Sequence, residues 1–184
     1  SETLEIKNLL TENLVLIIKD QNLPPKDLVK ISSLWGGAFE HPVFKGLEDT
    51  PEVLQIENMG EQFHTNAHWH SDVTFEQKPP NVTLLYAIEV PEEGGNTLFS
   101  NQYLAYEGLD EDIKAELDDL TAVHSNRSIL ELVGADVSGA KTVEHPIFRT
   151  HPESGRKAIF LTQAFVQNIT GMDSERSSGL LEDL

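Results

Sequence analysis

The segment "HTNAHWHSDVTF", residues 64–75, concentrates side chains that can bind a metal, with three histidines and an aspartate between His64 and Asp72. We expect a strand here, in which alternate residues point to opposite faces. One face would then be polar: His64, Asn66, His68, His70, Asp72 and Thr74. The other would be mainly apolar: Phe63, Trp69, Val73 and Phe75, with Thr65, Ala67 and Ser71. A polar face turned toward a cavity is what a metal or substrate site requires.

His70 and Asp72 have the spacing of a ligand pair. Side chains two residues apart on a strand point the same way and lie roughly 7 Å apart, so both can reach one metal. With a second histidine they would make the two-histidine, one-carboxylate face of non-haem Fe(II) oxygenases, which leaves positions open for a co-substrate and dioxygen. His-x-Asp alone is common, and two other interpretations stay open: a solvated polar strand, and zinc held by His68 and His70.

Composition restricts the class of protein. The 184 residues suit one domain, and 39% hydrophobic with 24% charged residues is typical of a globular chain. The net charge of −18 argues against nucleic acid or an anionic membrane as partner. Because there is no cysteine, any metal must be held by His, Asp or Glu. No apolar run is long enough to span a bilayer and no signal peptide is visible, so we expect a cytoplasmic protein, with homo-oligomerisation left open.

The elements around the segment are mostly short strands, with helices at the periphery. Helices are predicted at 2–12, 24–37, 102–119 (broken near Gly108) and 173–184. Strands are predicted at 13–21, 52–58, 63–75, 81–90, 96–101 and 121–126, with a hairpin around the turn "PESG". This order predicts a mainly β domain with flanking helices (α+β), a sandwich or jelly roll, incomplete at both ends.

Several motifs resemble the taurine dioxygenase family of Fe(II)- and 2-oxoglutarate-dependent oxygenases. They occur in the family's order: "WHSDVTF", the proline pair "PP", "GGNTLF", "AYEGL", "AVHSNR" and "HPIFRTHPESGRKAIFL". The stretch "VLIIKDQNLPP" near the start also matches, so the resemblance spans nearly the whole chain. It implies a double-stranded β-helix (jelly roll) and an enzyme that uses Fe(II), 2-oxoglutarate and O2.

The resemblance also assigns residues. His70 and Asp72 match iron ligands, Thr97 matches a residue whose hydroxyl binds a carboxylate of 2-oxoglutarate, and Asn66 matches a polar residue of the substrate and co-substrate pocket. His41 matches a histidine that contacts the anionic end of the substrate. Phe44 stands where taurine-specific members have tyrosine, which argues against taurine itself. Phe165 is expected to line the pocket or to be an ordinary core residue, whereas His145 and His151 are expected to be structural.

The family's second iron histidine, and the arginine that pairs with the far carboxylate of 2-oxoglutarate, have no match here. Nothing after Phe165 is a histidine, and Arg176 falls in the terminal helix. We therefore expect residues 1–184 to be one oxygenase domain that lacks the C-terminal strands carrying those two residues. The resulting hypothesis is a 2-oxoglutarate-dependent dioxygenase that hydroxylates a small anionic substrate, a sulfonate such as taurine or a related carboxylate or sulfate, releasing succinate and CO2. The alternative is a non-catalytic binding domain with a vestigial metal site.

Overall fold

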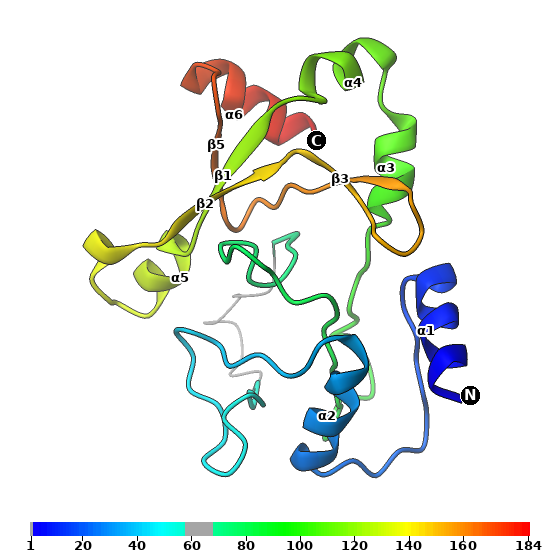
Figure 1. Cartoon of the computed structure of the whole chain (residues 1–184). Coiled ribbons are helices and arrows are strands. Elements are labelled where there is room, and N and C mark those ends of the chain that lie inside the picture. Colours follow the sequence, from blue (N-terminus) through cyan, green and yellow to red (C-terminus); the bar gives the residue numbers. More distant parts are fainter. Residues whose placement is uncertain (1, 58–67) are drawn as a thin grey trace. The chain divides into compact units, whose positions relative to one another are not determined.

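The computed structural model describes residues 2–57 and 68–184, which fall into two compact units (Figure 1). Of the described residues, the first unit comprises 2–57 and 80–101, and the second comprises 68–79 and 102–184. No helix among the described residues is long and apolar enough to cross a membrane.

The first unit contains the helices α1 (Glu2–Asn13) and α2 (Pro25–Ser32), and α2 continues into the 3-10 turn η1 (Ser33–Trp35). Proline is favourable at the first position of α2, where the missing N–H would have no helical partner. The helix ends at Gly36, whose φ of 113° is unfavourable for other residues. Both helices confirm the sequence-based prediction.

The strands predicted in this unit are wrong for the described residues. Residues 14–21, 53–57, 81–90 and 96–101 are extended or bent without a strand ladder. In the first of these segments, positive φ at Leu14 (67°) and Asp20 (57°) interrupts the extended backbone. Residues 82, 84 and 86 are half-buried while 81, 83 and 85 are exposed, so the predicted alternation is present without the ladder. A strand requires a hydrogen-bonded neighbour, and the described part of this unit offers only the isolated bridge Leu47–Thr50.

The second unit contains a three-stranded antiparallel sheet, of order β2–β1–β5, and a separate hairpin, β3–β4. Its strands are β1 (Thr121–Ser125), β2 (Thr142–Pro146), β3 (Phe148–Thr150), β4 (Lys157–Ile159) and β5 (Val166–Ile169). Its helices are α3 (Gln102–Gly108), α4 (Glu111–Leu117), α5 (Arg127–Leu132), η2 (Val137–Gly139) and α6 (Ser174–Asp183). The break near Gly108, the strand at 121–126, the hairpin and the last helix are all confirmed.

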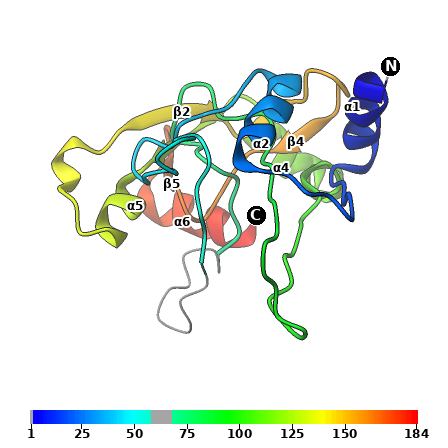
Figure 2. The ribbon, with the colours of Figure 1, turned by 90° about the horizontal axis from the view of Figure 1, so that it is seen from below.

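The core of the second unit lies between the strands and the helices α4 and α6. Its buried members are Leu117, Ala122, Ile147, Phe148, Ile159, Ile169 and Leu180. Helix α6 runs beside β5 (Figures 1 and 2) and is tied to it by the buried Ser177 hydroxyl, which accepts a hydrogen bond from the Ile169 N–H at 2.8 Å.

The predicted fold class is confirmed in part. Helices and strands are mixed, as an α+β class requires, but helices cover more of the described residues than strands do. The described strands form two small sheets and not a closed jelly roll. Strand pairing between residues distant in sequence is the part of a fold that local patterns specify least.

Two histidines lie side by side in the buried face of the sheet. His124 on β1 is 0% exposed and His145 on β2 is 5% exposed, with their ring centroids 5.2 Å apart. Burial, as the largest cause, and the neighbouring His145 and Arg149 together lower the pKa of His124 from 6.5 to about 4. His124 is therefore neutral in the folded protein at pH 7.

We expect the free energy of unfolding to depend on pH through His124. The unfolded chain takes up a proton near pH 6.5, but the folded chain does so only near pH 4, so this stabilisation is complete above pH 6.5 and is lost as the pH falls toward 4. The full loss is roughly 3 kcal/mol at 1.36 kcal/mol per pKa unit. The free energy of unfolding, measured in urea, should fall less between pH 7 and pH 5 in His124→Asn than in the unchanged protein. The control, Ser177→Ala, removes a buried hydrogen bond but no titrating group and should keep the unchanged drop; equal drops in all three proteins would contradict this assignment.

Candidate metal site

Within residues 68–76 the structure shows turns and bends, so the predicted strand is wrong in this part of the segment. Val73 has a φ of 56°, in the left-handed region, which turns the chain directly after Asp72. Residues 68–72 are exposed, with Trp69 at 52%, whereas Val73, Thr74 and Phe75 are all buried. The predicted alternation of polar and apolar faces is therefore wrong for residues 68–75, because the backbone turns at Val73. Asn66 lies outside the described residues.

The structure brings His70 and Asp72 together without a strand. Nε2 of His70 lies 3.5 Å from Oδ1 of Asp72, and both side chains reach solvent. Nδ1 of His70 lies 2.7 Å from the carbonyl oxygen of His68, and since a carbonyl can only accept, Nδ1 carries the hydrogen. In the neutral ring, Nε2 then presents its lone pair beside the Asp72 carboxylate. Metal-binding histidines characteristically donate their other N–H to a carbonyl or carboxylate in this way.

The pair offers one nitrogen and one oxygen donor, and this combination is of the kind that binds iron in oxygenases. The described residues contain no group of three His, Cys, Asp or Glu side chains placed to hold one. As candidate ligands the pair would account for two protein ligands, and residues 2–57 and 68–184 bring no third His, Cys, Asp or Glu to them.

Side chains from the second unit hold the segment on both sides of the turn. The Thr162 hydroxyl donates to the carbonyl oxygen of Trp69 at 3.4 Å. Phe165, 7% exposed, packs edge-on against Phe75 with centroids 5.2 Å apart. Phe165 thus packs on Phe75, the residue three positions after Asp72.

Sequence reasoning missed the polar partners of the segment. Nδ1 of His124 lies 2.9 Å from the hydroxyl of Thr74, and Nε2 of His145 lies 3.1 Å from the carbonyl oxygen of Glu76. Thr74 belongs to "WHSDVTF" and His124 to "AVHSNR", so the sequence analysis identified both motifs but not the contact between them. The contact between them joins residues fifty positions apart and has no local signal.

The remaining candidates lie in the first unit. Nδ1 of His41 accepts hydrogen bonds from the backbone N–H groups of Val43 (3.1 Å) and Phe44 (3.0 Å). The ring centroids of His41 and Phe44 lie 4.9 Å apart. Because Nδ1 is an acceptor, a neutral His41 carries its hydrogen on Nε2. Thr97 is exposed and follows the turn at Gly94 and Gly95, whose φ values are 81° and 66°.

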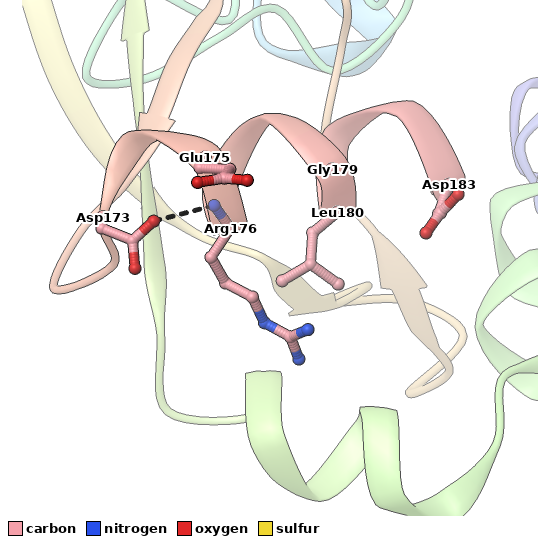
Figure 3. Close-up of a pocket in the computed structure, with 6 residues that line it drawn as sticks. All are labelled: Asp173, Glu175, Arg176, Gly179, Leu180 and Asp183. Carbon is pink, nitrogen blue, oxygen red and sulfur yellow. Dashed lines mark hydrogen bonds between the residues drawn. The ribbon is translucent and has the colours of Figure 1, made fainter.

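A hollow on α6 is a poor alternative site (Figure 3). It is lined by Asp173, Glu175, Arg176, Gly179, Leu180 and Asp183. Asp173 caps the helix by accepting from the Arg176 N–H at 2.9 Å, and the Arg176 guanidinium binds both carboxylate oxygens of Glu116. Asp173 and Arg176 thus stabilise α6 itself, and the residues that line the hollow include no histidine.

Comparison with known proteins gives consistent matches. The chain is 31% identical to the alpha-ketoglutarate-dependent sulfate ester dioxygenase of Pseudomonas putida, over 90% of this chain and 59% of that protein. Among solved structures, a taurine dioxygenase from Burkholderia xenovorans superposes with a TM-score of 0.76 at 28% identity, over 98% of this chain and 61% of that one. The structure of AAD-2 in complex with Mn(II) and N-oxalylglycine gives a TM-score of 0.78 at 27% identity, over 99% of this chain and 67% of that one.

The chain spans about 60% of the length of the sulfate ester dioxygenase and of the taurine dioxygenase. The model of the "Taurine catabolism dioxygenase TauD, TfdA family" matches residues 1–184. Because that match covers the whole chain, this protein belongs to the TauD/TfdA family of dioxygenases.

Proposed function

We propose that the protein containing this chain is an Fe(II)- and 2-oxoglutarate-dependent dioxygenase with a double-stranded β-helix fold. The observation that carries the proposal is the convergence of Nε2 of His70 and Oδ1 of Asp72 at 3.5 Å, with the other ring nitrogen held by a carbonyl. The relatives' names, which include sulfate ester and taurine dioxygenases, support a small anionic substrate, either a sulfonate, a sulfate ester or a carboxylate.

In this proposal His70 and Asp72 hold the iron, which when bound supplies the activation of dioxygen, with 2-oxoglutarate as the source of electrons. The backbone carbonyl of His68 fixes the His70 ring through Nδ1, so Nε2 keeps its lone pair for the metal. The side chains of both ligands are accessible, at 28% and 45%, as binding from solution requires.

The chain's own hydrogen-bond donors would orient the two organic anions. The hydroxyl of Thr97 donates to a carboxylate of 2-oxoglutarate. His41 donates from Nε2 to an anionic oxygen of the substrate, because its Nδ1 is occupied by the N–H groups of Val43 and Phe44. Asn66 contributes a further polar group, and Phe44, packed on His41, provides an apolar wall in place of a hydroxyl.

The activity is tested with the full-length protein. Incubated with Fe(II), 2-oxoglutarate and O2, it should form succinate, and faster when a small sulfonate or sulfate ester is added. Release of sulfite or sulfate would identify the substrate class. Tightly held stoichiometric zinc that iron cannot displace, together with no succinate, would overturn the proposal. Binding of a small anion without any turnover would favour a non-catalytic binding domain.

Replacing Asp72 by Ala should abolish the metal complex. Anaerobic Fe(II) and 2-oxoglutarate should give the unchanged protein a weak visible charge-transfer band, and the variant should lack it because one of the protein ligands is gone. His68→Ala is the matched control, since the backbone carbonyl of His68 and not its side chain contacts His70. An undiminished band in Asp72→Ala would remove Asp72 from the site.

Replacing Thr97 by Val should weaken 2-oxoglutarate binding. The shape is kept, but a carboxylate oxygen loses a donor, and a hydrogen bond to a charged group is worth roughly 1.5–3 kcal/mol. Titration of the charge-transfer band should therefore give a dissociation constant about tenfold higher or more. Thr97→Ser, which keeps the hydroxyl, should stay close to the unchanged value. Equal affinity in all three proteins would show that Thr97 takes no part.

A further inference from the structure

We propose that His124 and His145 are positioning residues that hold the metal-binding pair in place from the sheet of the second unit. This inference rests on the proposed function, since it concerns how His70 and Asp72 are presented to a metal. It adds two residues that do not themselves reach the metal and that act through Thr74 and Glu76.

The need for such residues follows from the backbone of the segment. Residues 68–76 have no strand ladder, and the hydrogen bond from the Glu76 N–H to the Val73 carbonyl at 3.1 Å only closes the turn. A loop that must present two ligands needs support from a rigid element. Mutation of groups that hydrogen-bond the ligands themselves typically weakens metal binding roughly 10–100-fold, and we expect the contacts of Thr74 and Glu76 to act in the same direction.

The two histidines supply that support by contacting Thr74 and Glu76, which lie two and four residues after Asp72. Nδ1 of His124 and the hydroxyl of Thr74 are 2.9 Å apart, and both side chains are almost completely buried, at 0% and 1% exposure. His145 donates from Nε2 to the Glu76 carbonyl at 3.1 Å, because a carbonyl can only accept. The Lys141–Glu76 ion pair also joins the segment to the sheet side, but its lysine is 55% exposed and such pairs are worth little.

The sheet gives the histidine rings fixed orientations. Ala122 pairs with His145 across β1 and β2, so His124, two residues further along β1, lies diagonally on the same face. The two rings meet edge to face at 5.2 Å, and Phe160 packs on both, at 5.5 Å from His124 and 5.3 Å from His145. Rings packed in this way cannot rotate away without opening the core, so Thr74 and Glu76 are held against a rigid sheet.

Stability alone does not explain a histidine at position 124. Its Nε2 is buried with no hydrogen-bond partner among the described residues, and burying an unpaired polar atom costs free energy that an apolar ring would not. The ring gains in return its contact with Thr74, through a nitrogen that stays uncharged because burial keeps the pKa of His124 low. A buried contact retained at that cost is consistent with a role in holding the segment.

The test measures Mn(II) affinity, using the full-length protein without 2-oxoglutarate, by electron paramagnetic resonance of the free ion. Thr74→Val keeps the side-chain shape but removes the hydroxyl that meets His124, and should raise the Mn(II) dissociation constant about tenfold or more. Thr74→Ser should restore affinity close to the unchanged value. Ser177→Ala is the control for simple destabilisation: it removes a comparably buried hydrogen bond on α6 and should lower the unfolding midpoint without changing Mn(II) affinity.

A second variant tests the other contact independently. His145→Phe keeps a ring against His124 and Phe160 but removes the N–H that Glu76 accepts, and it should also weaken Mn(II) binding several-fold. Unchanged Mn(II) affinity in both Thr74→Val and His145→Phe, in a protein that still makes succinate, would overturn this inference and leave the proposed function intact. A parallel loss of affinity in Ser177→Ala would reduce the effect to general stability and would also overturn it. Failure of the unchanged protein to bind Mn(II) or Fe(II) would overturn both.

Discussion

The candidate site depends on one backbone constraint, the left-handed conformation of Val73. The turn at φ 56° separates an exposed part, with His70 and Asp72, from the buried residues Val73, Thr74 and Phe75. A regular strand would have placed Thr74 on the same face as the ligands and Phe75 on the opposite one. The observed turn lets all three residues anchor in the core directly beside an accessible ligand pair.

The candidate ligands His70 and Asp72 are brought together by very little local structure. The spacing of His70 and Asp72 permits convergence on a strand and also in the observed turn, because both place the two side chains on the same side of the chain. The hydrogen bond from Nδ1 of His70 to the His68 carbonyl then selects which nitrogen is available. The choice of tautomer is thus made within three residues of sequence, whereas the support of the segment comes from strands far away along the chain.

The success of sequence-based prediction here follows the range of the interactions involved. The first turn of α2 is specified by Pro25 and its end by Gly36, and α6 begins where Asp173 can cap it, so these elements were predicted from a few neighbouring residues. The hairpin β3–β4 was predicted because its turn and both strands are adjacent. The strands predicted at 81–90 and 96–101 fail for the opposite reason: alternation predicts which side chains are buried, but a ladder also needs a partner strand, which no local pattern specifies.

The same distinction applies to the site. His70 and Asp72 were found from spacing and from the family motifs, and the structure brings them together. The metal-binding role of His70 and Asp72 and the functions of Thr97, His41 and Phe165 stay predictions, although the geometry of His41 fits its proposed role. The roles of His124 and His145 could not be predicted, because "AVHSNR" and "EHPIF" carry no sign that their histidines meet Thr74 and Glu76.

Electrostatics would make the proposed metal important for binding anions. The net charge of these 184 residues is −18, so this chain as a whole repels a dicarboxylate co-substrate and an anionic substrate. Six basic side chains of the second unit are already paired with carboxylates: Lys114, Arg127, Lys141, Arg156, Lys157 and Arg176. In the proposed function, a divalent ion at His70 and Asp72 would therefore be a strong local positive charge that attracts both anions. On this account the loss of the metal should weaken the binding of both anions together, because the attraction and the coordination come from the same ion.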